Sequence, residues 1–443
     1  MWKKIQSYFG NKYFLSLAGN ATMSVFGLVI AAVLYRALPI AELGVWVFFQ
    51  STLLLVDTFR AGFITTAFIK FHAGAAPDRA DEILGSTWFI ALCITIGFIL
   101  LNIPVFFLTG IIHDEALLFF SKWFGITYLC TLPSFVATCV VQSQQRFDRL
   151  LYIRFVSQTL FIAGIVFLIV TGYNNLQNII YANLAASALT SIFTLINGWA
   201  GVQKIGKRSK QGISDMFHFG KFSVGTTFGA NLFKTSDTFI INFMLGPAAL
   251  AIYNLGQRLM EIIEIPLRSF AATAMPALSE AYNQQKKQDV IQIMKKYVGM
   301  LTVALVPVAI VAVLLADVAI GLIGGGKYVG TEAANVFRLF MTFALLYPAD
   351  RFLALTLDVI HQPKINFIKV LVMLVFNIAG DIIGIYVLGN IYGVAITTVI
   401  PTLIGVLVGY FALRKYSRFR FVEMYTNGYR ECRDLIRTRL IKK

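Results

Sequence analysis

Long apolar stretches separated by short polar connections make up most of the chain. Each stretch is long enough for an α-helix to cross the hydrocarbon core, which takes about 20 residues. The stretches lack the strict alternation of barrel strands, so we expect helices, which satisfy every backbone hydrogen bond in lipid. We predict two groups of six spans, at roughly 14–36, 43–67, 84–108, 117–141, 151–171 and 177–200, then 217–244, 247–276, 296–316, 333–358, 365–388 and 391–413.

The distribution of lysine and arginine orients these spans. Of 38 basic residues, 29 lie in the N-terminal segment, the C-terminal tail and alternate connections, whereas the remaining connections hold only Arg36 and Lys327. Positive residues next to spans are retained on the cytoplasmic side. The pattern predicts that both termini are cytoplasmic. It also accounts for most of the net charge of +16, so we expect no nucleic-acid partner.

The composition agrees with a membrane protein and not with a soluble enzyme. Hydrophobic residues make up 58% and charged residues 14% of the chain, whereas soluble domains have about 45–50% and about 25%. The four cysteines have no paired spacing, and the four histidines are not grouped with acids or cysteines. We therefore expect no disulfide framework, metal site or catalytic residue.

A weak internal repeat divides the chain into two lobes. A shift of 207 residues places Leu38–Ala67 over Leu245–Ala274, with seven identities, and so matches span two with span eight. Because each lobe has an even number of spans, the repeat is parallel. We predict an N-terminal lobe, a cytoplasmic linker, a C-terminal lobe and a basic cytoplasmic tail, at 1–200, 201–220, 221–413 and 414–443. The tail is either an amphipathic segment on anionic headgroups or a solvated extension.

Many charged residues lie inside the predicted spans, mainly in spans two, seven, eight and ten. An ionisable group at this depth costs at least a few kcal/mol, so it faces a partner or a water-filled cavity. Structural ion pairs that fix helix packing are one explanation, and Asp57 with Arg60 fits it. We favour a polar cavity shared by the two lobes, because the charges concentrate in spans that the repeat makes equivalent.

The basic groups in these spans suit an anionic ligand, since guanidinium groups match phosphate oxygens and lysine adds a point charge. The candidates for binding substrate are Arg60, Lys234, Arg258, Arg268, Arg338 and Arg351. The acids either balance these cations or carry a coupling H⁺ or Na⁺, and the sequence leaves both roles open. They are Asp57, Asp237, Glu261, Glu264, Asp350 and Asp381, the last with Asn377 one turn before it.

Three segments resemble the polysaccharide transport family, the Wzx-type oligosaccharide flippases of the multidrug, oligosaccharidyl-lipid and polysaccharide exporter superfamily. The first is Leu38–Trp46 followed by Asp57–Gly62, the second runs from Gly246–Leu255 to Ala274–Ser279, and the third is Gly324–Tyr328. The similarity extends over essentially the whole chain in length, helix count and two-lobed plan.

The resemblance implies an alternating-access transporter, not an enzyme. Its substrate would be an oligosaccharide linked to undecaprenyl pyrophosphate, moved from the cytoplasmic to the periplasmic leaflet of a bacterial inner membrane for surface polysaccharides such as O-antigen or capsule. Membrane lipids and polysaccharide polymerase or assembly proteins are the other expected partners. A flippase of the peptidoglycan precursor and a multidrug antiporter of the same superfamily are the alternatives, although an antiporter of cations should have more acids than bases in its cavity.

Overall fold

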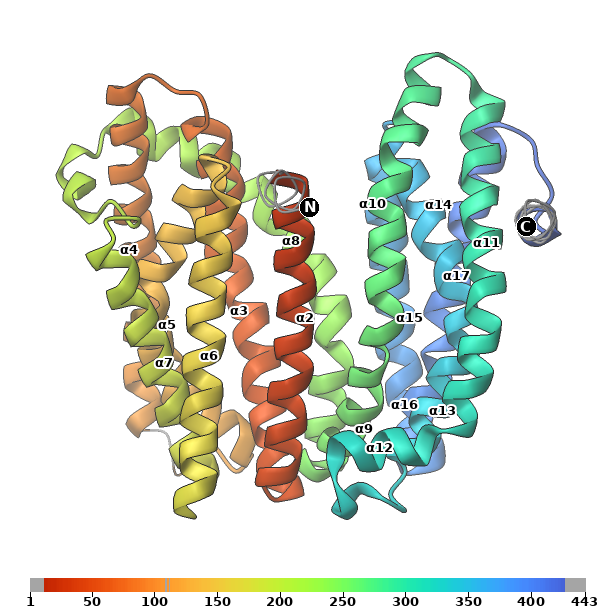
Figure 1. Ribbon diagram of the computed structural model, residues 1–443, viewed down its shortest axis with the longest axis horizontal. Helices are drawn as coiled ribbons and strands as arrows, with labels where there is room; N and C mark the ends of the chain where they lie inside the picture. Colours follow the sequence, from red (N-terminus) through yellow and green to blue (C-terminus); the bar gives the residue numbers. More distant parts are fainter. Residues whose placement is uncertain (1–11, 108–109, 111, 427–443) are drawn as a thin grey trace, which may run out of the picture. The chain divides into compact units, whose positions relative to one another are not determined.

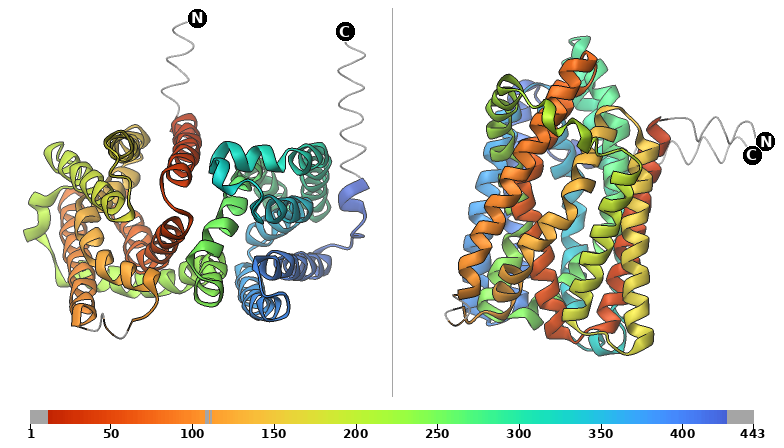
Figure 2. Two further views of the ribbon diagram at one scale, coloured as in Figure 1. Left: turned by 90° about the horizontal axis from the view of Figure 1, so that it is seen from below. Right: turned by 90° about the vertical axis from the view of Figure 1, so that its left-hand side faces the viewer.

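The computed structural model describes residues 12–107, 110 and 112–426, which form two compact units divided between Thr235 and Ser236. The N-terminal unit begins with six long helices (Figure 1). Their order along the chain is α2 (Lys12–Ala37), α3 (Ile40–His72), α4 (Pro77–Phe107), α5 (Glu115–Ser143), α6 (Phe147–Thr171) and α7 (Leu176–Ile196). Helix α2 packs on α6, and α3, α4 and α7 pack on α5, as the end-on view in Figure 2 shows.

The first unit ends with a short 3₁₀ helix, η1 (Val202–Lys207), and most of α8 (Lys210–Leu245), which continues across the division into the second unit. The C-terminal unit is also helical over its described residues. The remaining helices are α9 (Pro247–Leu259), α10 (Glu261–Asn283), α11 (Lys287–Leu314), α12 (Ala316–Gly324), α13 (Ala333–Phe343), α14 (Tyr347–Val359), α15 (Pro363–Leu388), α16 (Ile391–Thr397) and α17 (Val399–Tyr416), with 3₁₀ turns η2 (Gly326–Tyr328) and η3 (Ala344–Leu346).

The predicted fold class is confirmed: the protein is an all-α integral membrane protein with twelve spans in two six-helix lobes. Within the described residues, nine helical segments are long and apolar enough to cross a membrane. The other three spans correspond to α2, to the more polar α8, and to α9 and α10 together. A core of buried side chains from α3, α4, α5 and α8 holds the first unit, and a second core joins α10, α11, α14 and α17.

Several predicted spans are interrupted, which the apolar pattern does not show. The eighth span is divided at Met260, where α9 ends and α10 begins. Pro266 cannot donate a backbone hydrogen bond to Ile262, which weakens the first turn of α10. The tenth span comprises α13, η3 and α14, and the twelfth comprises α16 and α17. The predicted outer connection after the ninth span contains a further helix, α12.

The predicted linker, residues 201–220, is held firmly against α4 of the first unit. Asp81 accepts hydrogen bonds from the ammonium groups of both Lys204 and Lys207, each at 2.7 Å. A Cβ at Gly85 would lie only 2.6 Å from the Lys204 carbonyl oxygen, so glycine allows η1 to lie directly on α4. Ion pairing with Asp81 raises the pKa of Lys207. The linker is therefore a packed element of the first unit.

The start of the predicted tail folds back on the second unit. Phe419 and Met424 are buried in the core that α11 and α17 help to form. Lys295 of α11 donates a hydrogen bond of 2.6 Å to Glu423, and Tyr410 donates one to the Phe419 carbonyl. The two interpretations of the tail, as a headgroup-bound or a solvated segment, covered residues 414–443; its first part packs on the second unit, and residues 427–443 lie outside the described residues.

Candidate functional site

A group of buried polar side chains lies between α8, α9, α15 and α16 in the second unit. Asn377 donates hydrogen bonds through its amide to Asp237 at 2.6 Å and to Asp381 at 3.1 Å. Tyr253 donates its hydroxyl to the other Asp237 oxygen at 2.6 Å, and Thr397 donates to Asp381 at 3.2 Å. These five residues form what we call the carboxylate cluster. The structure thus brings together two of the predicted acids, which lie 144 positions apart in the sequence.

Close packing of α15 and α16 makes this arrangement possible. A Cβ at Gly393 would lie 2.2 Å from the backbone carbonyl of Gly384, so the two helices touch at their backbones. One turn earlier on α15, a Cβ at Gly380 would be only 3.1 Å from the Thr397 side chain. Small residues allow such contact between membrane helices. The glycines therefore position Thr397 against Asp381.

The chemistry of the cluster suits a small cation. Asp237 and Asp381 are 8% and 0% exposed, and within the described part of the chain neither carboxylate forms an ion pair. Two buried carboxylates without a cation are costly, so a proton or a metal cation must offset their charge. Carboxylate, amide and hydroxyl oxygens are the ligands that hard cations prefer. The cluster could hold H⁺ or Na⁺.

Arg60 is fully engaged inside the first unit. Its guanidinium forms an ion pair with Asp57 at 2.8 Å and donates to the Tyr128 carbonyl and the Thr131 hydroxyl. It also lies between two aromatic rings, 4.6 Å from the Tyr128 centroid and 4.4 Å from that of Phe135. This geometry is typical of a structural cation. Substrate binding by Arg60 stays a prediction.

Two other predicted substrate-binding bases pair with predicted acids at the junction of α9 and α10. The Arg258 guanidinium lies 2.9 Å from the Glu261 carboxylate, and the Arg268 guanidinium lies 2.6 Å from that of Glu264. All four side chains are partly exposed, between 28% and 56%. Such pairs between exposed helix neighbours contribute little stability, about 0.3–0.5 kcal/mol. They can open to accept another anion.

The remaining three bases differ in their surroundings. Arg338 on α13 pairs with Asp317 of α12 at 2.5 Å and donates to Asn335 at 2.6 Å. Lys234 on α8 and Arg351 on α14 are exposed, and within the described residues no carboxylate pairs with either. An unpaired cation on a membrane helix is costly unless water or an anion reaches it. These two are the freest of the six predicted bases.

Lys369 lies within the predicted span 365–388 but was not among the residues predicted to form the site. Its side chain is 3% exposed, and its ammonium lies 2.8 Å from the carboxylate of Asp350 on α14. Spacing could have shown this, because Lys369, Asn377 and Asp381 follow each other at multiples of four positions and so share one face of α15. All three are buried.

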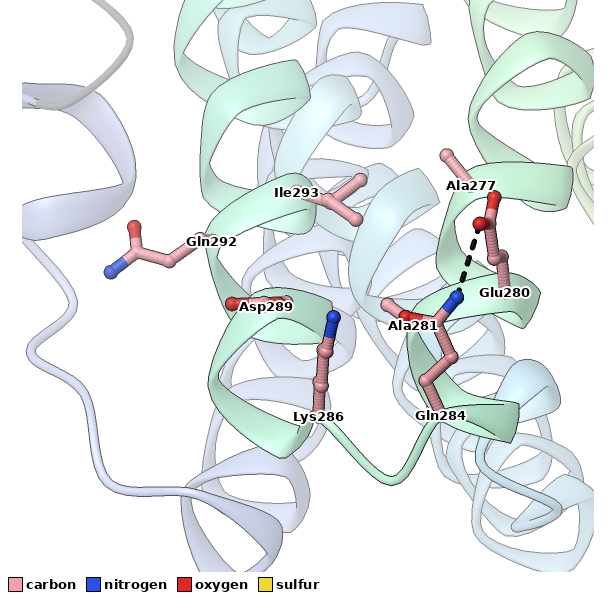
Figure 3. A pocket seen from close by; sticks show the side chains of 8 residues that line it. All are labelled: Ala277, Glu280, Ala281, Gln284, Lys286, Asp289, Gln292 and Ile293. Carbon is pink, nitrogen blue, oxygen red and sulfur yellow. Dashed lines mark hydrogen bonds between the residues drawn. The ribbon is translucent and has the colours of Figure 1, made fainter.

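A polar cavity of about 350 Å³ lies at the turn between α10 and α11 (Figure 3). Glu280, Gln284, Lys286 and Asp289 contribute polar groups, and Gln284 donates a hydrogen bond of 3.1 Å to Glu280. Acids and a base are mixed here, and the cavity lies at a helix turn with none of the six predicted bases in its lining. We assign it no role in binding.

Known proteins resemble the chain over most of its length. The model of the family described as "Polysaccharide biosynthesis protein" matches residues 33–332, more than half of the sequence. The chain belongs to this family. A probable low-salt glycan biosynthesis flippase of Haloferax volcanii, Agl15, is 21% identical over 418 residues, which cover 93% of this chain and 84% of the relative. The predicted resemblance to the polysaccharide transport flippases is confirmed.

Solved structures support the fold assignment. A multidrug transporter of the MATE family in the MOP superfamily, in an inward-facing conformation, superimposes with a TM-score of 0.74 at 16% identity, covering 89% of this chain and 96% of the transporter. The lipid II flippase MurJ, in an inward closed conformation, gives a TM-score of 0.73 at 16% identity and covers 97% of this chain and 93% of its own. At 16% identity, these two similarities show that the chain shares the fold of both proteins.

Proposed function

We propose that the protein is a flippase for oligosaccharides linked to undecaprenyl pyrophosphate. It moves them from the cytoplasmic to the periplasmic leaflet of a bacterial inner membrane for surface polysaccharide synthesis, with both termini cytoplasmic. The observation that carries the proposal is the match to the polysaccharide biosynthesis family over residues 33–332. The similarity to the probable glycan biosynthesis flippase of Haloferax volcanii supports a glycan flippase activity.

In this proposal the carboxylate cluster carries the coupling cation. Asp237, Asn377, Asp381 and Thr397 supply oxygen atoms around two buried charges that have no cation partner among the described side chains. A cation that binds one conformation better than another shifts the equilibrium between them by its difference in affinity. Binding of H⁺ or Na⁺ at this group therefore supplies a means to couple an ion gradient to the conformational cycle.

The anionic head of the substrate is proposed to contact the cations that are least occupied. Lys234 and Arg351 are exposed, and the pairs formed by Arg258 and Arg268 are weak enough to open. A pyrophosphate offers more acceptor oxygens than a single glutamate and so competes well for a guanidinium. Arg60 is proposed to fix α3 against α5 through its hydrogen bonds to α5, and its predicted contact with substrate would require Asp57 to release the guanidinium.

The test is transport by purified protein in proteoliposomes. Lipid-linked oligosaccharide is placed in one leaflet, and the sugar that becomes accessible to periodate from the other side is measured with an imposed Na⁺ gradient, H⁺ gradient or neither. We expect gradient-stimulated translocation, reduced at least about tenfold in Asp381→Asn. Translocation no faster than in protein-free vesicles would exclude the proposed substrate.

The same vesicles separate the alternatives. Lipid II replaces the oligosaccharide lipid in one arm, and a fluorescent cationic drug replaces it in another. Faster movement of lipid II than of the oligosaccharide lipid would reassign the protein to peptidoglycan synthesis. Gradient-driven efflux of the drug would reassign it to multidrug export.

A further inference from the structure

Tyr253 is the member of the carboxylate cluster that comes from α9. Its side chain is 1% exposed, and its hydroxyl donates to a carboxylate oxygen of Asp237 at 2.6 Å. The ring also packs edge to face on Phe340 of α13, with the two centroids 5.5 Å apart. Helices α9, α13 and α16 meet at one end of the second unit (Figure 1). The hydrogen bond therefore fixes the rotation of α9 about its own axis.

The strength of this hydrogen bond depends on the charge of Asp237. Hydrogen bonds to an ionised acceptor are shorter and roughly twice as strong as those between neutral groups. The second carboxylate oxygen of Asp237 accepts from Asn377, so both oxygens are engaged. A proton or metal cation on Asp237 neutralises the charge that attracts the phenol. We expect the bond from Tyr253 to weaken when a cation binds.

The other hydroxyl of the cluster, that of Thr397, has an alternative that keeps its helix in place. It lies 3.2 Å from Asp381 and 2.8 Å from the carbonyl oxygen of Gly393, one turn earlier on α16. Its proton can turn to that carbonyl, so that the hydroxyl oxygen faces a cation while α16 stays still. Tyr253 donates to a different helix, so the loss of its bond to Asp237 releases α9.

The far end of α9 carries a predicted substrate-binding base. Arg258 lies five positions after Tyr253 and pairs with Glu261 across the interruption at Met260. Between them, a Cβ at Gly256 would lie only 3.1 Å from a side chain of α13, so the two helices are in close contact there. A helix held at this point can turn about it. Release at Tyr253 therefore reaches Arg258 through about 8 Å of continuous helix.

The junction of α9 and α10 is the weakest part of the eighth span. The Met260 amide donates to the carbonyl of Gln257, three positions earlier, where a regular α-helix would use the fourth. Pro266 supplies no amide hydrogen for the carbonyl of Ile262. Backbone amides in such a segment exchange with deuterium at rates that report local opening. Exchange at residues 257–265 therefore reports whether α9 is held or released.

We propose that Tyr253 is a positioning residue that transmits cation binding at Asp237 to the pair of Arg258 and Glu261. Without a cation, the phenol holds α9 in the orientation in which this pair is closed. With a cation on Asp237, α9 turns, the pair opens, and Arg258 becomes available to an anion. This inference rests on the proposed function and adds the path between its ion site and its anion site. Coupling between two sites is reciprocal, so an anion at Arg258 raises the affinity of the cluster for its cation by the same factor.

Hydrogen–deuterium exchange of the full chain in nanodiscs tests this path, with Na⁺ compared with choline at one pD. In the parent protein, Na⁺ should slow exchange around Asp381 on α15, because the cation orders the cluster. It should speed exchange at residues 257–265 about threefold or more, because the phenol loses its charged acceptor. A purely structural role of Tyr253 would change exchange in the same direction at both places. Slower exchange at both places would overturn the proposal.

Three variants provide the matched comparison. Tyr253→Phe removes only the hydroxyl, so exchange at 257–265 should be fast from the start and unresponsive to Na⁺, while the slowing on α15 persists. Asp237→Asn presents a neutral acceptor and should speed exchange at 257–265 with no cation added, whether the natural ion is Na⁺ or H⁺. Tyr328→Phe removes a hydroxyl from another fully buried tyrosine of the same unit, outside the cluster, and should behave as the parent. Unaltered exchange at 257–265 in both Tyr253→Phe and Asp237→Asn would refute the path, and the parent with Asp237→Asn decides the question if Tyr253→Phe does not fold.

Transport separates this inference from the proposed function. In the proteoliposome assay, Tyr253→Phe should lose stimulation by the ion gradient, whereas Tyr328→Phe should keep it. If the parent protein moves the lipid-linked oligosaccharide and both variants keep the stimulation, the path through Tyr253 is wrong and the flippase assignment stands. If the parent protein moves no such lipid, the proposed function fails, while opposite responses to Na⁺ at 257–265 and on α15 still support the link between the cluster and the junction.

Discussion

Gly393→Ala tests the close contact that builds the carboxylate cluster. The added Cβ would lie 2.2 Å from the carbonyl of Gly384, and ordinary contact begins at 3.4 Å, so α16 must move by about 1.2 Å. Thr397 lies one turn further along α16. A movement of that size would lengthen its bond to Asp381 from 3.2 Å to about 4 Å, beyond hydrogen-bond range.

The expected loss in the free energy of unfolding of Gly393→Ala follows from these two changes. Overpacking of a tight contact costs about 1–3 kcal/mol, and loss of a hydrogen bond to a buried carboxylate adds about 1.5 kcal/mol. We expect a lower midpoint of thermal unfolding in detergent and a reduced response of transport to the ion gradient. Unfolding is followed by intrinsic fluorescence, and transport by the proteoliposome assay.

Gly97→Ala is the control. A Cβ at Gly97 on α4 meets no atom within 4 Å, so alanine should be neutral or slightly stabilising there. If Gly393→Ala unfolds at the same temperature as Gly97→Ala and keeps its response to the gradient, the backbone contact does not position Thr397.

Three further predictions concern other contacts. The hydrogen bond from Lys295 lowers the pKa of Glu423, so docking of the segment that carries it is fully stabilised above the ordinary glutamate value of about 4.3 and weakens as the pH falls through the lowered pKa. Limited cleavage of this segment by pepsin, which is active in acid, should rise as the pH falls through that range, and Glu423→Gln should remove that pH dependence. Arg60→Lys should destabilise the first unit by about 1–3 kcal/mol, because a lysine ammonium cannot reproduce the several guanidinium hydrogen bonds and the stacking between two rings; a midpoint unchanged in thermal unfolding would contradict this. Lys369→Met should destabilise by about 1–3 kcal/mol by leaving Asp350 without its partner, and the added change Asp350→Asn should restore part of the loss; purely additive effects in chemical unfolding would show that the pair is not coupled.

The helical membrane fold could be predicted from the sequence because the patterns that indicate it are each spread over many residues. Long apolar stretches and the asymmetry of lysine and arginine each depend on many residues, so no single exception obscures them. No such pattern in the sequence predicts the interruption at Met260 between α9 and α10. The repeat aligns this region with α3, which is continuous from Ile40 to His72. The aligned segments alone therefore do not predict that α3 is one helix while its counterpart is split into α9 and α10; tertiary packing decides this.

The candidate site was predictable in part. Asp237, Asn377 and Asp381 are polar residues in apolar spans, and their cost in lipid made them visible from sequence alone. Thr397 and Tyr253 were not visible, because hydroxyl-bearing residues are common in membrane helices and only tertiary contact gives them a role. Lys369 was not predicted as a site residue because it lies close to the start of its span, where lysine usually extends to the headgroups.

One face of α15 connects two of the features described above. Lys369 and Asp381 lie twelve positions apart on that face, about 18 Å along the axis at 1.5 Å per residue. A rigid helix cannot rotate at one of these positions without rotating at the other. Any turn of α15 that accompanies binding of a cation between Asp237 and Asp381 would therefore also alter the ion pair with Asp350, so the state of the cluster can be reported at the far end of the same helix.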